Sequence, residues 1–276
     1  MGSSCEMVKT SNFIEAKVIE PCGNWLADVG RYAVMVGSTF AAILTKRPRW
    51  DLVCFHLYEI GVRSLPLIFI TGIAIGMVLS AQSFFQLSDK GLTGATGLMV
   101  AKSMLVEIGP ILTAFIMTGR VGAAICAELG SMRVSEQIDA MACMGVDPIE
   151  YLVVPRYLAM GVMMPVLTIF SSAAGIFGGW FLAVNLYGMS TQNFFDPVQV
   201  YLTWFDITCN VVKSTVFGLL IVSVACFEGM ATKGGAAGVG RSTTTSVVVA
   251  YSSILGANFL LTVSLNALYW YIFGFS

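Results

Sequence analysis

Five stretches of this chain consist mostly of apolar residues, and polar residues are concentrated in the segments between them. The five apolar stretches cover about residues 65–87, 98–117, 157–186, 207–227 and 246–273. A helix of ~20 residues spans the hydrocarbon core of a bilayer, so each stretch is long enough to cross it. Because a single segment in lipid satisfies its backbone polar groups only as a helix, the pattern predicts an all-α polytopic membrane protein with five transmembrane helices.

A further apolar pattern precedes the first span, at residues 25–44. Its apolar residues recur every three or four positions, while Asp28 and Arg31 lie off the apolar stripe. Such a pattern is typical of an amphipathic helix that lies in the membrane interface. We expect an N-terminal interfacial or elbow helix here, with a shallow spanning helix as the alternative. Residues 1–24 are expected to be a cytoplasmic segment, and residues 25–276 to form one membrane domain.

The few charged residues are distributed unevenly along the chain. They make up 11% of it, against about 25% in a typical soluble domain. Lys and Arg occur before the first span and in the loops 118–156 and 228–245, whereas the loop 187–206 contains neither. Because cytoplasmic loops carry an excess of basic residues, we expect a cytoplasmic N-terminus and both basic loops in the cytoplasm. With five spans, the C-terminus is then expected outside.

The composition also argues against several classes of function. Lys and Arg number 15 against 16 Asp and Glu, so the chain lacks the basic excess of a nucleic-acid-binding protein. Its seven cysteines include no C-x-x-C pair, and His56 is the single histidine. Because metal sites need clustered thiolates or imidazoles, we expect no metal, no cofactor bound by this chain and no catalytic residues.

The most polar loop lies between the second and third spans, at about residues 124–150. Val134, Ile138 and Met141 share one helical face, which predicts one short amphipathic helix, and Gly145 suits the left-handed position that ends it. Asp147 then has the position of an N-cap before a proline. This pattern favours a coupling helix that inserts into a partner, with an ordinary capped intracellular connection as the alternative.

Residues 235–242 nearly match the phosphate-binding P-loop, but Arg241 replaces the required lysine. A P-loop also follows a strand, whereas this segment follows a predicted span. We interpret it as a flexible cytoplasmic turn, with Ser242, Thr243 and Thr244 as candidate N-caps of the fifth span.

Several stretches closely resemble the signature motifs of the MlaE (YrbE) family of ABC-transporter permeases. They are residues 107–110 (EIGP), 119–122 (GRVG), 128–141 (ELGSMRVSEQIDAM), 144–148 (MGVDP) and 238–244 (GVGRSTT). These motifs follow one another in order from the second span to the start of the fifth, and the resemblance does not cover the residues before about 25.

The resemblance implies a homodimeric permease in the inner membrane of a Gram-negative bacterium, moving phospholipids between the inner and outer membranes. It implies three kinds of partner: a dimer of cytoplasmic ABC ATPase subunits that binds ATP and magnesium, a periplasmic MCE-domain protein, and in some systems a STAS-domain subunit. The chain itself is then a transporter subunit and not an enzyme. The residues expected to couple it to the ATPase are Glu128, Arg133, Glu136, Asp139 and Asp147.

Three charged residues lie within the predicted spans, namely Lys102, Glu107 and Lys213. A charged side chain at a helix centre costs about 2.5–3.5 kcal/mol, so each needs a partner or a role. Pro110 also leaves the carbonyl of Val106 without its usual helical donor. One hypothesis is that Glu107 and Lys213 line an outward-facing cavity, with Lys102 at its mouth, where a lipid phosphate binds. The alternative is a structural ion pair between Glu107 and Lys213.

One position departs from the family pattern at this site. Members of the family often have a basic residue directly before the glutamate, whereas Val106 stands there in this chain. Lys102, one turn earlier on the same face, can take that place. The expected lipid-binding set is therefore Glu107, Lys102, Lys213 and the position of Val106.

The apolar character of the spans supports a lipid substrate, because a path for sugars or amino acids needs more hydrogen-bonding side chains. Two other classes of function remain open. One is an ion-coupled secondary transporter or channel that uses Glu107 as its ion site. The other is a membrane scaffold that anchors partners without moving a substrate.

Overall fold

The computed structural model describes residues 20–45 and 49–274. This part of the chain is almost entirely helical and contains no strand, which confirms the predicted all-α class. The chain divides into two compact units, Met1–Arg47 and Pro48–Ser276. The segment 1–24 expected to precede the membrane domain lies for the most part outside the described residues.

The described part of the first unit is a single helix, α2 (Glu20–Thr45). It contains the whole of the predicted helix 25–44 and begins earlier. Asp28 and Arg31, the two residues off the apolar stripe, form an ion pair one turn apart on its exposed surface. The helix is confirmed, and its place in or across the membrane stays a prediction.

The second unit begins with two long helical rods that are interrupted by short π-helical turns. A π-turn adds one residue to a helical turn and is common at functional sites. In order, the elements are α3 (Trp50–Leu57), η2 (Tyr58–Val62), α4 (Leu65–Ser88), η3 (Thr93–Ala95), α5 (Thr96–Ser103), η4 (Met104–Ile108), α6 (Gly109–Met117), η5 (Thr118–Gly122) and α7 (Ala123–Val134).

The remaining elements complete the bundle. They are α8 (Gln137–Cys143), η6 (Ile149–Val153), α9 (Val154–Asn185), α10 (Thr191–Tyr201), α11 (Trp204–Met230) and α12 (Gly235–Phe273). Within the described residues, five helical stretches are long and apolar enough to cross a membrane, as predicted: Trp50–Ser88, Thr93–Val134, Ile149–Asn185, Trp204–Met230 and Gly235–Tyr271.

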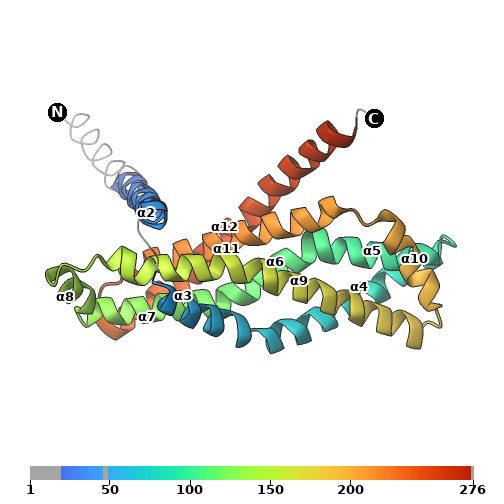
Figure 1. Ribbon diagram of the computed structural model, residues 1–276, viewed down its shortest axis with the longest axis horizontal. Coiled ribbons are helices and arrows are strands. Elements are labelled where there is room, and N and C mark those ends of the chain that lie inside the picture. The colour runs from blue at the N-terminus through green and yellow to red at the C-terminus, as the bar shows by residue number, and fades with distance from the viewer. Residues whose placement is uncertain (1–19, 46–48, 275–276) are drawn as a thin grey trace, which may run out of the picture. The chain divides into compact units, whose positions relative to one another are not determined.

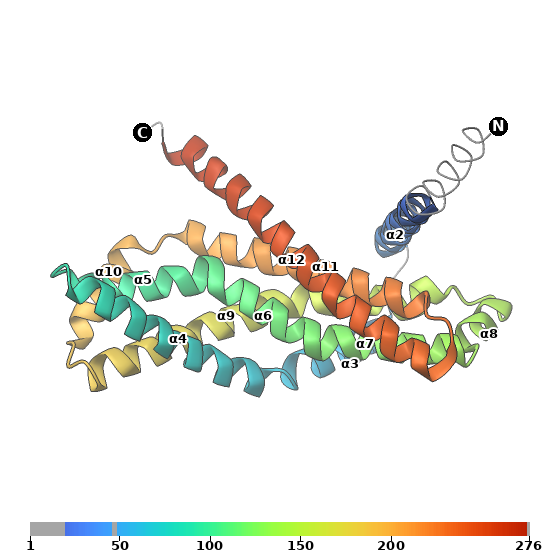
Figure 2. The ribbon, with the colours of Figure 1, turned by 180° about the vertical axis from the view of Figure 1, so that it is seen from behind.

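The connections of the second unit gather at two opposite ends of the bundle. The short helix α8 and the turn between α11 and α12 lie at one end, and α10 lies at the other (Figure 1). The view from behind shows the same separation (Figure 2). The loops predicted to be cytoplasmic therefore share one end, while the loop without Lys or Arg lies at the other.

Small residues let α4 and α9 pack along one another at close range. A Cβ on Gly76 would collide with the carbonyl oxygen of Gly175, and one on Gly178 would collide with the backbone of Ile73. Apolar burial drives helices together only weakly in lipid, so close backbone approach through small residues supplies the contact. The α4–α9 pair forms the most extensive helix contact in the unit.

The last two spans differ sharply in burial. In the most apolar part of α11, 61% of residues are buried inside the chain, whereas the corresponding figure for α12 is 17%. The C-terminal part of α12 leaves the other helices in both ribbon views (Figures 1 and 2), and Phe259, Leu260 and Val263 are exposed on it. A helix that is apolar on an exposed side faces lipid or another protein chain.

The expected flexible turn at 235–242 is wrong, because these residues form the first turns of α12. The helix starts after Gly234, whose φ of +90° is left-handed, and no side chain caps it. Thr243 and Thr244 lie inside the helix and donate to the carbonyls of Val239 and Gly240. Packing of these turns against α7 and α11 overrides the low helix propensity of the glycines.

The single amphipathic helix expected across residues 134–141 is also wrong. The chain breaks at Glu136, which has a left-handed φ of +58°, and α8 starts after it. The break lets α8 turn so that Ile138 is buried. The left-handed Gly145 at the end of α8 is confirmed, with a φ of +77°.

Candidate functional site

The centre of the second unit contains a polar cluster built around the π-turn η4. In a π-turn each amide bonds the carbonyl five residues earlier, and Gly109 closes the turn on Met104. Pro110 has no N–H, so the carbonyl of Val106 loses its ordinary helical donor. The sequence around Glu107 thus presents backbone acceptors that neighbouring helices must satisfy.

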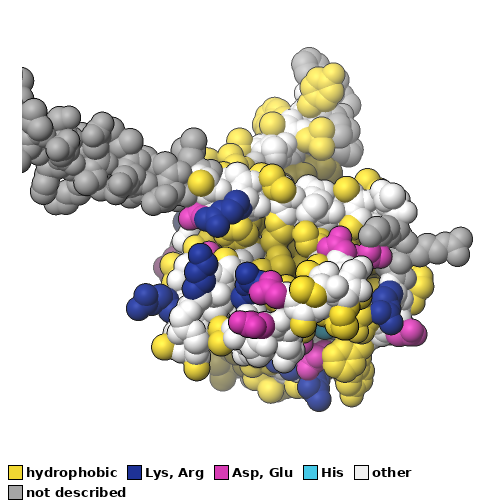
Figure 3. Space-filling model, turned by 90° about the vertical axis from the view of Figure 1, so that its left-hand side faces the viewer, with side chains coloured by type: hydrophobic (Ala, Val, Ile, Leu, Met, Phe, Trp, Pro, Cys, Tyr) yellow, Lys and Arg dark blue, Asp and Glu magenta, His cyan; other side chains and the backbone are white. Residues whose placement is uncertain are grey.

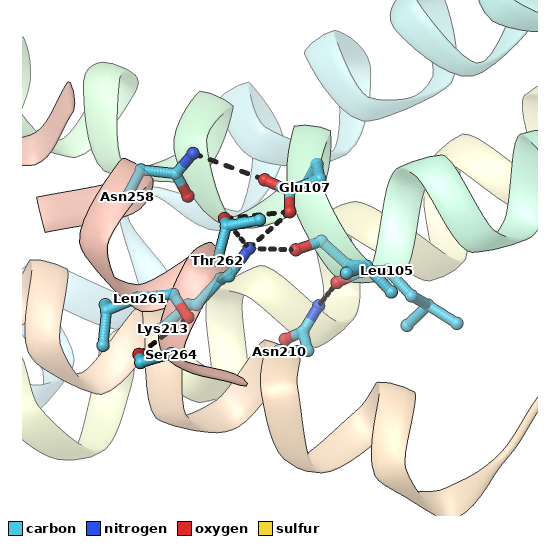
Figure 4. Close-up of polar contacts among 9 residues, drawn as sticks. Leu105, Glu107, Asn210, Lys213, Asn258, Leu261, Thr262 and Ser264 are labelled. Atoms are coloured by element: carbon cyan, nitrogen blue, oxygen red, sulfur yellow. Dashed lines mark hydrogen bonds and ion pairs between the residues drawn. The ribbon is translucent and has the colours of Figure 1, made fainter. Parts of the chain in front are cut away.

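Side chains from α9 and α11 satisfy these acceptors one after another. The Ser172 hydroxyl donates to the Met104 carbonyl at 3.1 Å, and the Asn210 amide donates to the Leu105 carbonyl at 2.8 Å. The Lys213 ammonium donates to the Val106 carbonyl at 3.0 Å. Figure 4 shows the last two of these bonds side by side. Three consecutive carbonyls of the turn are therefore fixed by a second and a third helix.

Lys213 also forms the ion pair that the sequence suggested. Its Nζ lies 2.6 Å from Oε1 of Glu107 and 2.9 Å from Oγ1 of Thr262 (Figure 4). Thr262 in turn donates to Oε1 of Glu107 at 3.1 Å, and Asn258 donates to Oε2 at 3.3 Å. All three N–H groups of Lys213 thus have acceptors, and α12 contributes two side chains to the cluster, Asn258 and Thr262.

The two partners of this ion pair differ in exposure. The Lys213 side chain is 1% exposed, whereas that of Glu107 is 35% exposed. An ion pair in a low-dielectric interior is stable only when hydrogen bonds satisfy the remaining donors and acceptors, as they do here. The carboxylate is the part of the cluster that a molecule from outside can reach first.

The other residues expected in the lipid site are not all drawn into the cluster. Lys102 is exposed on α5, and none of the described carboxylates lies within ion-pair distance of it. Val106 takes part through its backbone carbonyl, and its side chain is half-buried. The structure therefore joins Glu107 to Lys213 and leaves Lys102 apart, while a headgroup contact at this site stays a prediction.

Sequence reasoning missed four polar members of the cluster: Ser172, Asn210, Asn258 and Thr262. Two signals point to three of them, and none singles out Ser172. Asn210 is an amide in an otherwise apolar span, and Asn258 and Thr262 are polar residues four positions apart, which places them on one face of a helix. Polar side chains facing the interior of a membrane bundle usually bond to one another across helices.

The residues expected to couple to an ATPase lie away from this central cluster, at the end of the second unit that carries α8. Arg133 and Asp139 form an ion pair across the break between α7 and α8. Glu136 is exposed at that break. Asp147 is exposed and accepts from the amide of Ile149 at 3.0 Å, as expected of a capping residue.

Glu128 differs from the other four expected coupling residues. Its carboxylate lies 2.9 Å from the guanidinium of Arg156, a residue of α9 that is 2% exposed. Glu128 therefore faces the bundle, while the other four surround the α7–α8 break and the turn after it.

A metal site would need a group of acidic, cysteine or histidine side chains close together. Within residues 20–45 and 49–274, no group of three or more could hold a metal ion. Cys54, Cys126, Cys143, Cys209 and Cys226 are free thiols.

Comparison with known proteins gives the chain a family. The profile described as Permease MlaE matches residues 53–264, which is more than half of the chain. A probable ABC transporter permease of Synechocystis is 38% identical over 228 residues, covering 83% of this chain and 87% of that protein. The intermembrane phospholipid transport system permease protein MlaE of Haemophilus influenzae is 34% identical over 238 residues, covering 85% and 90%.

A plant protein extends the comparison. The chloroplastic protein TRIGALACTOSYLDIACYLGLYCEROL 1 of Arabidopsis thaliana is 34% identical over 229 residues, which cover 83% of this chain and 65% of that protein. The five apolar helical stretches agree with a multi-pass membrane permease. The chain therefore belongs to the MlaE family of ABC transporter permeases.

Proposed function

We propose that this chain is the permease subunit of an ABC transporter that moves phospholipids between the inner and outer membranes of a Gram-negative envelope. The observation that carries the proposal is the match to the MlaE permease profile across residues 53–264. The Haemophilus influenzae relative bears the name of an intermembrane phospholipid transport permease, which supports the substrate class.

The polar cluster at Glu107 suits the headgroup of an amphiphile. Apolar helices surround a carboxylate that is 35% exposed and a lysine that is 1% exposed. Lys213 donates hydrogen bonds to Glu107 and Thr262. A lipid phosphate that enters here can replace these two residues as the acceptor of those bonds. Lys102, exposed on α5, can meet the phosphate first, at the mouth of the path.

The proposal assigns ATP hydrolysis to separate subunits. A dimer of cytoplasmic ABC ATPase subunits, holding ATP and magnesium, docks at the end of the bundle that carries α7 and α8. Glu128, Arg133, Glu136, Asp139 and Asp147 are the proposed coupling residues. The exposed ion pair between Arg133 and Asp139 is available to a docking protein, because each side chain keeps part of its surface in solvent.

The proposed assembly also contains a second copy of the permease and a periplasmic MCE-domain protein, with a STAS-domain subunit in some systems. The exposed apolar residues of α12, among them Leu255, Phe259 and Leu260, support a homodimer. The basic loops support a cytoplasmic N-terminus and a periplasmic C-terminus in the inner membrane.

The test is reconstitution of the chain with its co-purified subunits in liposomes that contain a fluorescent phospholipid. We expect lipid transfer to acceptor vesicles that requires ATP and stops with a non-hydrolysable ATP analogue. Transfer by the chain alone under an ion gradient would instead support a secondary transporter that uses Glu107. Normal lipid transport in cells that lack the chain would support a scaffold.

A further inference from the structure

A second group of charged residues surrounds a cavity at the end of the bundle that carries α7 and α8. Figure 3 views the molecule from this end, where acidic and basic side chains gather. The cavity has a volume of about 150 Å³ and lies between α3, the π-turns η2 and η5, α7 and the start of α9. Its charged or titratable lining residues are His56, Glu59, Arg63, Arg120, Glu128 and Arg156.

Arg156 is buried against this cavity with one donor unused. One terminal nitrogen donates to the Leu152 carbonyl at 2.7 Å, and the other lies 2.9 Å from the Glu128 carboxylate. Its Nε is buried and has no hydrogen-bond partner among the described residues. A buried charged donor without an acceptor destabilises a protein. Such a group therefore suggests that a bound molecule supplies the acceptor.

Arg120 supplies an unbalanced positive charge at the same cavity. It donates to the Ser64 hydroxyl, and none of the carboxylates in the described ranges forms an ion pair with it. Each of the two lining glutamates already has an arginine: Glu59 lies 3.0 Å from Arg63, and Glu128 pairs with Arg156. Three arginines and two glutamates therefore leave one positive charge in excess.

We propose that this cavity binds the phosphodiester group of a phospholipid headgroup. A phosphodiester carries one negative charge, which matches the single excess charge, and its oxygens can accept from Arg120, which lines the cavity and has no carboxylate partner among the described residues. The Nε of Arg156 can join this contact only if the arginine side chain shifts, because Nε is buried as it stands. Ile60, Val121 and Ile125 add apolar lining for the glycerol and the first acyl carbons. The site is separate from the Glu107–Lys213 cluster and lies at the end of the bundle predicted to be cytoplasmic.

The inference rests on the proposed function, because it takes a phospholipid to be the natural ligand of this chain. The chemistry it needs is the phosphodiester alone. A soluble phosphate compound offers similar oxygens to the arginines, so the experiment must separate a lipid source from a soluble one.

The test is equilibrium binding of dihexanoyl phosphatidylglycerol to the full chain, purified with its subunits in mild detergent and followed by native mass spectrometry. We expect Arg120→Gln to weaken binding by about tenfold, since hydrogen bonds to charged groups contribute on this scale. Arg49→Gln is the matched control. Arg49 is an exposed arginine before α3 that stacks on Tyr151 and does not line the cavity, so its loss should leave binding unchanged.

Two further variants separate binding from folding. Ala124→Phe places a ring at the rim of the cavity without removing any charge, and we expect the same weakening. Arg156→Lys keeps a positive charge but has no Nε, and we expect partial weakening. Melting curves should show that the Arg120 and Ala124 variants stay folded. Unchanged binding in both of these folded variants would overturn the proposal.

Inorganic phosphate serves as the competitor, at 50-fold excess over the lipid. At roughly this ratio, phosphate displaces a substantial part of the lipid if its affinity for the site is no more than about 50-fold weaker. Continued lipid binding supports the lipid source, and full displacement would overturn it in favour of a soluble phosphate. The transport assay is read separately. If transport depends on ATP but lipid binding is unchanged by Arg120→Gln, the proposed binding site is wrong and the proposed function stands. If Arg120→Gln weakens lipid binding but no ATP-dependent lipid transfer is measured, the proposed function is wrong and the binding site stands.

Discussion

Two almost fully buried cations of this permease, Lys213 and Arg156, are held in different ways. Their side chains are 1% and 2% exposed, and each pairs with a glutamate that is more exposed, Glu107 and Glu128 respectively. Lys213 has no N–H left without an acceptor, whereas Arg156 keeps one donor atom, Nε, without an acceptor in the described part of the chain. In the Lys213 cluster the atoms without a partner among the described residues are acceptors, the amide oxygens of Asn210 and Asn258.

The largest effect on this comparison should come from Lys213→Met. The substitution removes the ion pair with Glu107 and leaves the Val106 carbonyl without a donor. We expect the free energy of unfolding to fall by about 3–5 kcal/mol, the usual loss when one partner of a buried pair is removed. The measurement is a thermal or denaturant melt of the purified chain in detergent.

Lys102→Met is the matched control for that substitution. Lys102 is an exposed lysine in the neighbouring α5, so its removal should change stability by no more than about 0.5 kcal/mol. Equal losses in the two variants would mean that Lys213 has no structural role.

Exchanging the charges of the inner pair is the next strongest test. In Glu107→Lys with Lys213→Glu an ion pair can form again, but a carboxylate at position 213 cannot donate to the Val106 carbonyl. We expect the double variant to remain about 1–3 kcal/mol less stable than the parent, the cost of an unsatisfied buried group. Lipid transport should also stay impaired. Full recovery of transport would show that pairing alone matters and would exclude a headgroup role for Lys213.

Thr262→Val should have a smaller effect. The hydroxyl accepts from Lys213 and donates to Glu107, so it links the last span to the pair. Valine keeps the shape and removes both bonds, and we expect a loss of about 1 kcal/mol of unfolding free energy. Thr262→Ser keeps the hydroxyl and serves as the control. A serine variant as unstable as the valine variant would show that the methyl group matters and the bonds do not.

Much of the polar cluster around Glu107 and Lys213 could be predicted from the sequence. Apolar runs predicted five spans, intramembrane charges singled out Glu107 and Lys213, and Pro110 indicated the free carbonyl at Val106. Each of these signals is local: a run length, a charge in an apolar run, or a missing N–H. The partners Asn258 and Thr262 were not found, because their relevance depends on which face of α12 meets η4 and α11, and long-range packing sets that face.

The charged residues around the cavity at Arg120 and Arg156 could mostly not be predicted in this way. Glu128 and Arg156 lie 28 positions apart, and His56 and Arg120 come from other elements, so no spacing rule connects them. The break at Glu136 was missed for a related reason. Helical periodicity continues through residues 134–141, and only burial of Ile138 against the bundle favours a left-handed residue there.

The smallest expected effect is that of Glu128→Gln, and it tests the Arg156 side of the comparison. Water reaches the Glu128 side chain, which is 57% exposed, and the glutamine amide oxygen can still accept from Arg156. We expect a loss of about 0.5 kcal/mol, as for ion pairs that solvent screens. We expect a larger loss for Glu107→Gln, because Glu107 accepts from Lys213, Thr262 and Asn258. Both are measured by the same melt. Equal losses of unfolding free energy in Glu128→Gln and Glu107→Gln would mean that Arg156 depends on its carboxylate as strongly as Lys213 does. The two buried cations would then not differ in the way proposed here.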